Sequence, residues 1–179
     1  FTVTARAQYS VPLTTGWNLV SIPANPVDSS IDSVVPSTHP ATQILTYDPG
    51  DANGPWLVAT RATDGTWTGT LTTIDASRAY WVETTSFAPI SVGIPDQGFN
   101  VLPPFLQVVG GWNLVPVVSI EGDAPGSTIS ADTYFGSTKW VTAYTFNTQT
   151  GTWTKILPKS FSNVVVGAGY WLYVTEDGI

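Results

Sequence analysis

The pentapeptide GWNLV occurs twice in this chain of 179 residues, at 16–20 and at 111–115. After each copy the same features follow in the same order: a polar stretch with a short helical piece, a strand, a turn, a tryptophan that opens a return strand, and a closing Tyr-Trp pair. Such self-similarity is the sequence signature of a duplicated structural unit. The matched residues are Trp17 and Trp112, Tyr47 and Tyr144, Trp56 and Trp153, and Trp81 and Trp171.

Short strands, turns marked by glycine and proline, and the lack of a long helical pattern predict an all-β protein. We expect two tandem homologous units, each a β-sandwich or a small barrel, Ig-like in general character. The first repeat, with an N-terminal strand, spans 1–90, a connecting segment spans 91–110, and the second repeat spans 111–179. Only the first copy carries an extra hairpin, at 64–68. The short helical pieces are expected within 28–35 and 127–135.

The first eleven residues alternate between apolar and polar side chains, which predicts a half-buried strand. It lies outside the repeat, and two interpretations stay open: an edge strand of the first unit, or a strand donated to a neighbouring subunit. Its apolar face consists of Phe1, Val3, Ala5, Ala7, Tyr9 and Val11. Between the two copies, Ile90 and Val92 predict one more strand, 95–98 predicts a turn, and the prolines at 103–104 stiffen the approach to the second copy.

The charge pattern excludes several classes of partner. Charged residues make up 11% of the chain, against about 25% in an ordinary soluble domain. The net charge is −7 and no two of the six basic residues are adjacent, so we expect no nucleic acid and no anionic membrane surface as partner. No apolar run is long enough for membrane insertion. Cysteine and methionine are both lacking, which excludes disulfides; we also expect Phe1 to begin a processed product or a fragment.

The eight tryptophans fall into two groups. Six occupy matched places in the two copies, and we expect them to serve the two cores, because a core position must survive duplication whereas a ligand site need not. Trp67 and Trp140 have no counterpart. They are candidates for stacking on a glycan, and local packing or a subunit contact is the alternative.

Residues for catalysis are scarce, and we expect no enzyme. The single histidine, His39, precedes a proline in a loop, and no nucleophile-elbow motif accompanies it. The carboxylates offer no matched pair for a glycosidase. Asp48, Asp51 and Asn53 lie in a glycine-containing loop and form a candidate calcium site. The chemistry of a hairpin turn explains the same residues, so no cofactor is required.

The order GWNLV, Tyr, Trp and (Gly/Ala)-Tyr-Trp-(Val/Leu) resembles a repeat found in secreted and cell-surface proteins of prokaryotes, in surface-layer or adhesin-like chains. The resemblance covers most of 16–82 and 111–172. It implies an extracellular or cell-surface location, with a virion surface as a variant, and supplies no catalytic residues. Together with the low charge, it predicts a structural module of a filament, surface layer or stalk that self-associates into a homo-oligomer or polymer. A carbohydrate-binding module is the alternative.

Overall fold

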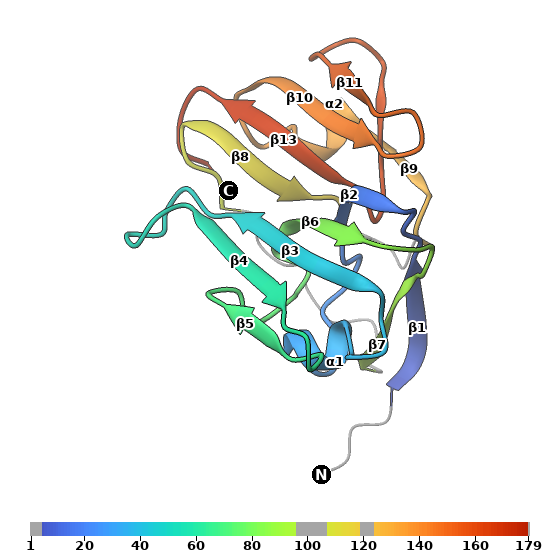
Figure 1. Cartoon of the computed structure of the whole chain (residues 1–179). Helices are drawn as coiled ribbons and strands as arrows, with labels where there is room; N and C mark the ends of the chain where they lie inside the picture. Colours follow the sequence, from blue (N-terminus) through green and yellow to red (C-terminus); the bar gives the residue numbers. More distant parts are fainter. Residues whose placement is uncertain (1–4, 96–106, 119–123, 179) are drawn as a thin grey trace.

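The computed structural model describes residues 5–95, 107–118 and 124–178. In these residues the chain consists of antiparallel strands and two one-turn helices, which confirms the all-β class (Figure 1). The strands are β1 (Ala5–Val11), β2 (Gly16–Ser21), β3 (Ala41–Tyr47), β4 (Trp56–Arg61), β5 (Trp67–Gly69), β6 (Ala79–Thr84), β7 (Ile90–Pro95), β8 (Gly111–Pro116), β9 (Thr128–Ser130), β10 (Trp140–Asn147), β11 (Thr152–Ile156), β12 (Asn163–Val165) and β13 (Gly169–Val174). The helices are α1 (Ile31–Val34) and α2 (Ala131–Tyr134).

The first main sheet has the strand order β2-β6-β3-β4-β5. Alternation along β6 turns Tyr80 and Val82 into a core that is covered by α1 and by the two-stranded ribbon β1-β7. Ile90 and Val92 of β7 are buried in this core, so the first unit extends into the range expected to be a connecting segment. The helical piece expected within 28–35 is confirmed by α1, and the extra hairpin at 64–68 by β5.

The second main sheet has the order β11-β10-β13-β8. It is covered by α2 and the short pair β9-β12, and its core contains Phe135, Tyr170 and Leu172. The second core also includes Val108, which precedes the second GWNLV. The order opening strand, closing strand, middle strand, return strand is the same as in β2-β6-β3-β4. The two main sheets therefore share one topology, and β5 is an addition to the first.

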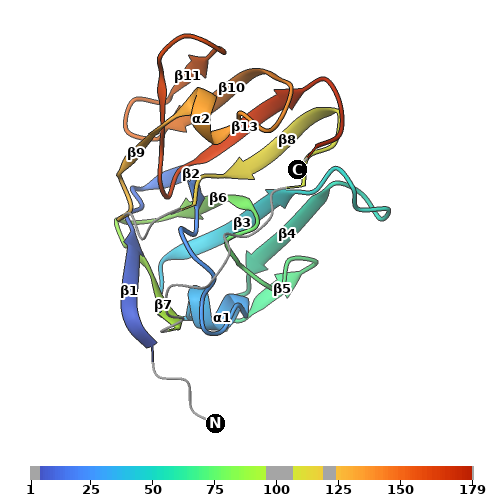
Figure 2. The same cartoon turned by 180° about the vertical axis from the view of Figure 1, so that it is seen from behind.

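The two main sheets pack against each other through the faces that point away from their own cores. Leu19, Ala79 and Leu114 form the centre of this contact. The chain is thus layered: ribbon and α1, first sheet, second sheet, then α2 with β9-β12 (Figures 1 and 2). The hydroxyl of the fully buried Ser21 ties the sheets together, because it lies 3.0 Å from the carbonyl oxygens of both Val117 and Ala168.

The strand register corrects one matched pair. In the first sheet, Thr46 donates a hydrogen bond to the carbonyl of Ala79, and in the second sheet Thr145 donates one to the carbonyl of Gly169. The residue that follows each threonine faces the matched tryptophan of the return strand, and it is Tyr47 in β3 but Phe146 in β10. Matching Tyr47 to Tyr144 was wrong, because the alignment followed the letter and missed a two-residue difference in the strand.

The N-terminal strand is paired within its own chain. β1 runs antiparallel to β7, with Tyr9 opposite Val92 and Val11 opposite Ile90. Val11 is buried and Tyr9 is partly buried against the first core. This pairing favours the edge-strand interpretation. Ala5 and Ala7 belong to the paired stretch. Phe1, Val3, the prolines at 103–104 and all but the first residue of the turn expected at 95–98 lie outside the described residues.

Candidate functional site

The matched tryptophans do not fill the two cores. Trp56 and Trp153 keep 45% and 49% of their surface exposed, and Trp112 keeps 42%. The expectation of six core rings was therefore wrong. In the closing Tyr-Trp pairs, alternation sends Tyr80 and Tyr170 into the cores and the following tryptophan to the opposite face of the sheet. The large buried residues of the cores are those tyrosines and Phe135.

Two aromatic triads span the boundary between the main sheets. Trp171 of the second sheet packs on Tyr47 and Trp56 of the first, with ring centroids 5.2 and 5.9 Å apart. Trp81 of the first sheet packs on Phe146 and Trp153 of the second, at 5.4 and 5.7 Å. The two triads consist of matched residues, because Trp171 corresponds to Trp81, Tyr47 to Phe146, and Trp56 to Trp153. These rings therefore hold the sheets together while the return-strand tryptophans stay partly open to solvent.

A third aromatic cluster lies on the same face of the second sheet, beyond the contact between the sheets. Trp112 packs edge-on against Tyr173 at 5.2 Å and is tilted against Tyr144 at 5.9 Å. The ammonium of Lys155 lies 5.9 Å from the Tyr144 ring centre. We call these four residues the aromatic surface. Trp112 and Tyr173 are exposed by 42% and 37%.

The first sheet carries different residues at the places that match the aromatic surface. The strand registers place Trp17 at the position of Trp112, and the remaining counterparts are Glu83, Leu45 and Val58. The ring of Trp17 packs against Trp81 at 6.4 Å, and its carbonyl accepts a hydrogen bond from Thr148 of the second unit. The exposed cluster of three rings is thus specific to the second sheet. The sequence reading missed it, because Trp112 and Tyr144 were interpreted as matched residues of the repeat and Tyr173 lies just beyond the closing motif.

Trp67 and Trp140 are both packed against their own cores. The indole N–H of Trp67 donates to the carbonyl of Val35 at 2.9 Å, and the guanidinium of Arg61 covers the ring at 4.0 Å from its centre. Trp140 contacts Phe135 at 5.4 Å. Both rings are partly buried. These surroundings favour local packing over the glycan-binding role considered from the sequence.

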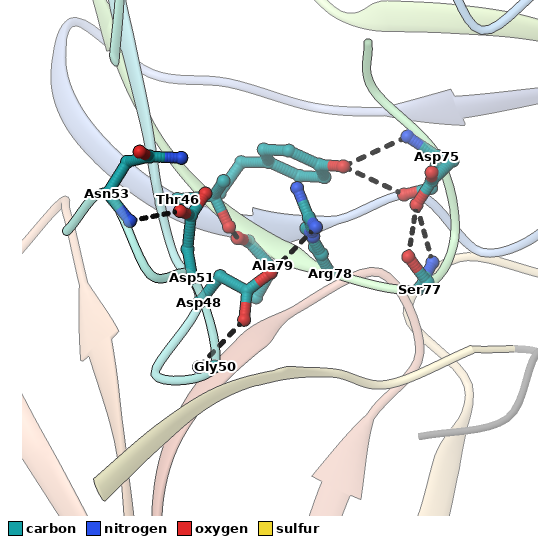
Figure 3. A network of polar contacts seen from close by, with 10 residues as sticks. Thr46, Asp48, Gly50, Asp51, Asn53, Asp75, Ser77, Arg78 and Ala79 are labelled. Atoms are coloured by element: carbon teal, nitrogen blue, oxygen red, sulfur yellow. Dashed lines mark hydrogen bonds and ion pairs between the residues drawn. The ribbon is translucent and has the colours of Figure 1, made fainter. Parts of the chain in front are cut away.

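The acidic loop after β3 is organised as a turn (Figure 3). One oxygen of Asp48 accepts the backbone N–H of Gly50, and the other pairs with Arg78 at 2.8 Å. Asp51 accepts the backbone N–H of Asn53 at 2.8 Å. Among the described residues, no group of three or more His, Asp or Glu side chains is placed to hold a metal ion. The geometry favours the turn interpretation of Asp48, Asp51 and Asn53, and calcium binding stays a prediction.

His39 is built into the first unit by burial and backbone contacts. Its Nδ1 accepts the backbone N–H of Ala41 at 3.2 Å. Burial lowers the pKa of the imidazole, the nearby Arg61 acts in the same direction, and the carbonyls of Pro89 and Ala88 oppose the shift. The ring is therefore neutral at pH 7, and its hydrogen bond in the described part of the chain goes to backbone.

Strand β11 forms one edge of the second sheet. Its residues Thr152, Trp153, Thr154 and Lys155 are all exposed, and among the described residues β10 is its pairing partner. The matching strand of the first sheet, β4, has its outer edge covered by β5. An open edge of backbone donors and acceptors invites another strand.

Comparison of the chain with family models, with curated proteins and with solved structures returned no match. None of the helices in the described part of the chain is long and apolar enough to cross a membrane.

Proposed function

We propose that this chain is a non-catalytic structural module of an extracellular assembly, built from two homologous β units and self-associating through sheet edges and apolar side chains. The observation that carries the proposal is the aromatic surface. Large apolar residues gathered on an uncovered sheet face mark an interaction site in a soluble protein. Aromatic residues are also the residue types that dominate the energetics of protein interfaces.

The duplication itself supports a structural role. The two main sheets share strand order, the buried tyrosine of the closing strand and the threonine hydrogen bond between the middle and closing strands. Such a paired unit makes a rigid piece, because each sheet packs on its own core with one face and on the other sheet with part of its second face. Rigid, layered β units suit a filament, a surface layer or a stalk.

The proposed location outside the cell rests on the sequence. The resemblance of the GWNLV repeat to modules of secreted and cell-surface chains supports it. So does the composition, in which 11% of residues are charged and hydroxyl side chains line the exposed strands.

Sedimentation velocity and negative-stain microscopy of the purified chain at neutral pH, with and without Ca²⁺, test this proposal. We expect oligomers or regular polymers, and we expect Trp112→Ala to weaken them. The matched control is Phe87→Ala, which removes a ring that is 69% exposed and lies outside the aromatic surface. A chain that stays monomeric at high concentration, or that assembles equally well without the Trp112 ring, contradicts the proposal.

A carbohydrate-binding module is the second candidate, and the aromatic surface moves its site from Trp67 and Trp140 to Trp112. The rings of this surface stand at 52° and 69° to one another. They therefore form no flat platform for a crystalline polysaccharide, and a single sugar held between a ring and Lys155 is the better fit. Retention of the monomeric wild type on a glycan array, lost in Trp112→Ala with an unchanged melting temperature, would favour this candidate over assembly.

A further inference from the structure

The tetrapeptide GTWT occurs twice, at 65–68 and at 151–154. The two copies do not occupy matched places in the duplication. The first leads into β5, the strand that covers the outer edge of β4. The second leads into β11, which is itself an edge strand. The chain therefore contains one copy of this sequence already bound to a sheet edge, and a second copy whose outer edge carries no strand among the described residues.

The pair β4-β5 shows what this sequence recognises on the strand beside it. Arg61 lies opposite Trp67, and Thr60 lies opposite Thr68, in antiparallel register. The guanidinium of Arg61 stands 4.0 Å from the centre of the Trp67 ring, which is a cation–π contact. Facing threonines and a facing cation–aromatic pair are both favourable cross-strand pairs. A strand in which a threonine precedes a basic residue can therefore pair antiparallel with a strand in which a tryptophan precedes a threonine.

Strand β11 carries both halves of this match in one sequence, Trp153-Thr154-Lys155. When two copies of β11 run antiparallel with Thr154 at the centre, each Trp153 faces the other copy's Lys155. The two Thr154 residues face each other, and each Thr152 faces an Ile156. The overlap includes all five residues of the strand, and the arrangement has the two-fold symmetry of an isologous dimer.

We propose that β11 is the docking edge for a second copy of this chain, paired antiparallel about Thr154 so that the two second sheets join into one. This inference rests on the proposed self-association and names the sheet edge that takes part in it. Lysine on an edge strand normally discourages strand addition. Here it selects its partner, because an incoming strand must offer an aromatic ring opposite Lys155, and a second β11 does so.

The side chains of Trp153, Thr154 and Lys155 are accessible to a second strand. Lys155 and Thr154 are exposed, and Trp153 keeps 49% of its surface exposed although it packs on Trp81 and Phe146. The first sheet offers no such site on the matching strand, because β5 covers β4. The contact is therefore expected to form dimers through the second unit alone.

The test combines a repulsive substitution with a cross-link. Thr154→Lys places two like charges opposite each other at the two-fold centre of the interface, and we expect it to weaken the dimer on the order of tenfold or more in sedimentation equilibrium. Thr63→Lys is the control, because it makes the same change at an exposed turn residue of the first unit. The chain has no cysteine, so Thr154→Cys introduces a lone thiol, which we expect to form a disulfide-linked dimer under mild oxidation, whereas Thr63→Cys does not.

Three outcomes distinguish the β11 docking edge from the more general proposal that the chain self-associates. Loss of the dimer in Thr154→Lys together with cross-linking in Thr154→Cys supports the docking edge. Self-association that is unchanged in Thr154→Lys, with no cross-link beyond that of the control, overturns the β11 edge and leaves the proposed assembly standing. A wild-type chain that is monomeric at every concentration overturns both.

Discussion

Gly169 opens β13 where the two main sheets approach most closely, and we predict that Gly169→Ala destabilises the chain. The backbone of Gly169 has no positive φ, so alanine meets no conformational penalty there. Space is the constraint. A Cβ at this position would lie 2.9 Å from the Cβ of Ala79 and 2.9 Å from Cδ1 of Leu19. Ala79 occupies the matching place in the first sheet and is completely buried.

The size of the effect follows from these distances. Carbon atoms in contact prefer a separation of about 3.5–4.0 Å, so the new methyl group is about 0.6–1.1 Å too close to its neighbours. The end of Leu19 can rotate away, but the Cβ of Ala79 is fixed to the backbone of β6 and moves only with the sheet. Overpacking of this kind costs about 1–3 kcal/mol. In a chain of this length, that lowers the melting temperature by about 2–12 °C.

Urea denaturation and thermal melting of four variants, Gly169→Ala, Ala79→Gly, their double variant and a control, test this prediction. Gly110→Ala is the control, because its Cβ would have no neighbour closer than 3.6 Å, and we expect it to change stability little. The exchange variant Ala79→Gly/Gly169→Ala moves the methyl group from one sheet to the other. We expect it to be more stable, by about 1 kcal/mol or more, than the sum of its single substitutions allows. A Gly169→Ala protein as stable as wild type, or strictly additive effects in the exchange variant, would refute the close approach of the sheets.

Two further predictions concern the tyrosine hydroxyls and the acidic loop. Tyr80 and Tyr170 each accept the backbone N–H of the residue five positions earlier, at 2.9 and 3.0 Å, so removing either hydroxyl by a change to Phe is expected to cost about 1–3 kcal/mol in urea denaturation. Burial raises the pKa of both phenols, so these tyrosines ionise in the unfolded chain at a lower pH than in the folded chain. The free energy of unfolding of the wild type therefore falls as the pH rises through about 10. A free energy of unfolding that stays constant from pH 8 to 11 would contradict this. Asp48→Asn breaks the ion pair with Arg78, in which both side chains are about one-third exposed. We expect it to lower the free energy of unfolding by less than about 1 kcal/mol, and this difference should disappear in 1 M NaCl. A melting temperature that rises with Ca²⁺ in wild type but not in Asp48→Asn would instead establish the loop as a calcium site.

The repeated order of residues was sufficient to predict the class, the helical pieces and the extra hairpin, because strand and turn preferences are local. Gly16 and Gly111, which begin the two pentapeptides and open β2 and β8, both have positive φ. The burial of the tryptophans was predicted wrongly. In a closing Tyr-Trp pair either residue can face the core, and the side depends on what packs on each face of the sheet, which is a long-range property.

The aromatic surface and the open edge of β11 could not be predicted for a related reason. Both are places that no strand or helix covers in the part of the chain that the structure describes, and coverage depends on sheet order and on the packing of one sheet on the other. In the first sheet, Trp17 is held by Trp81 and by Thr148 of the second unit. In the second sheet, Trp112 is exposed beside Tyr173. The two tryptophans stand in identical pentapeptides, so the difference between them arises from tertiary structure alone.

The packing of two sheets with the same strand order has a physical reason in the layered structure. A single unit would bury one face of its main sheet under a helix and a small strand pair, and would leave the other face open with Leu19, Ala79 and Trp81, or with Leu114 and Trp171, in water. Packing two such faces together removes both from solvent, and the exchange of Trp81 and Trp171 between the aromatic triads makes each unit complete the other's packing. Each half is therefore expected to depend on the other for its stability. Among the described residues, Trp112 and Tyr173 on the second sheet stay exposed after this exchange, and the same physical reason underlies the proposal that a second chain covers them.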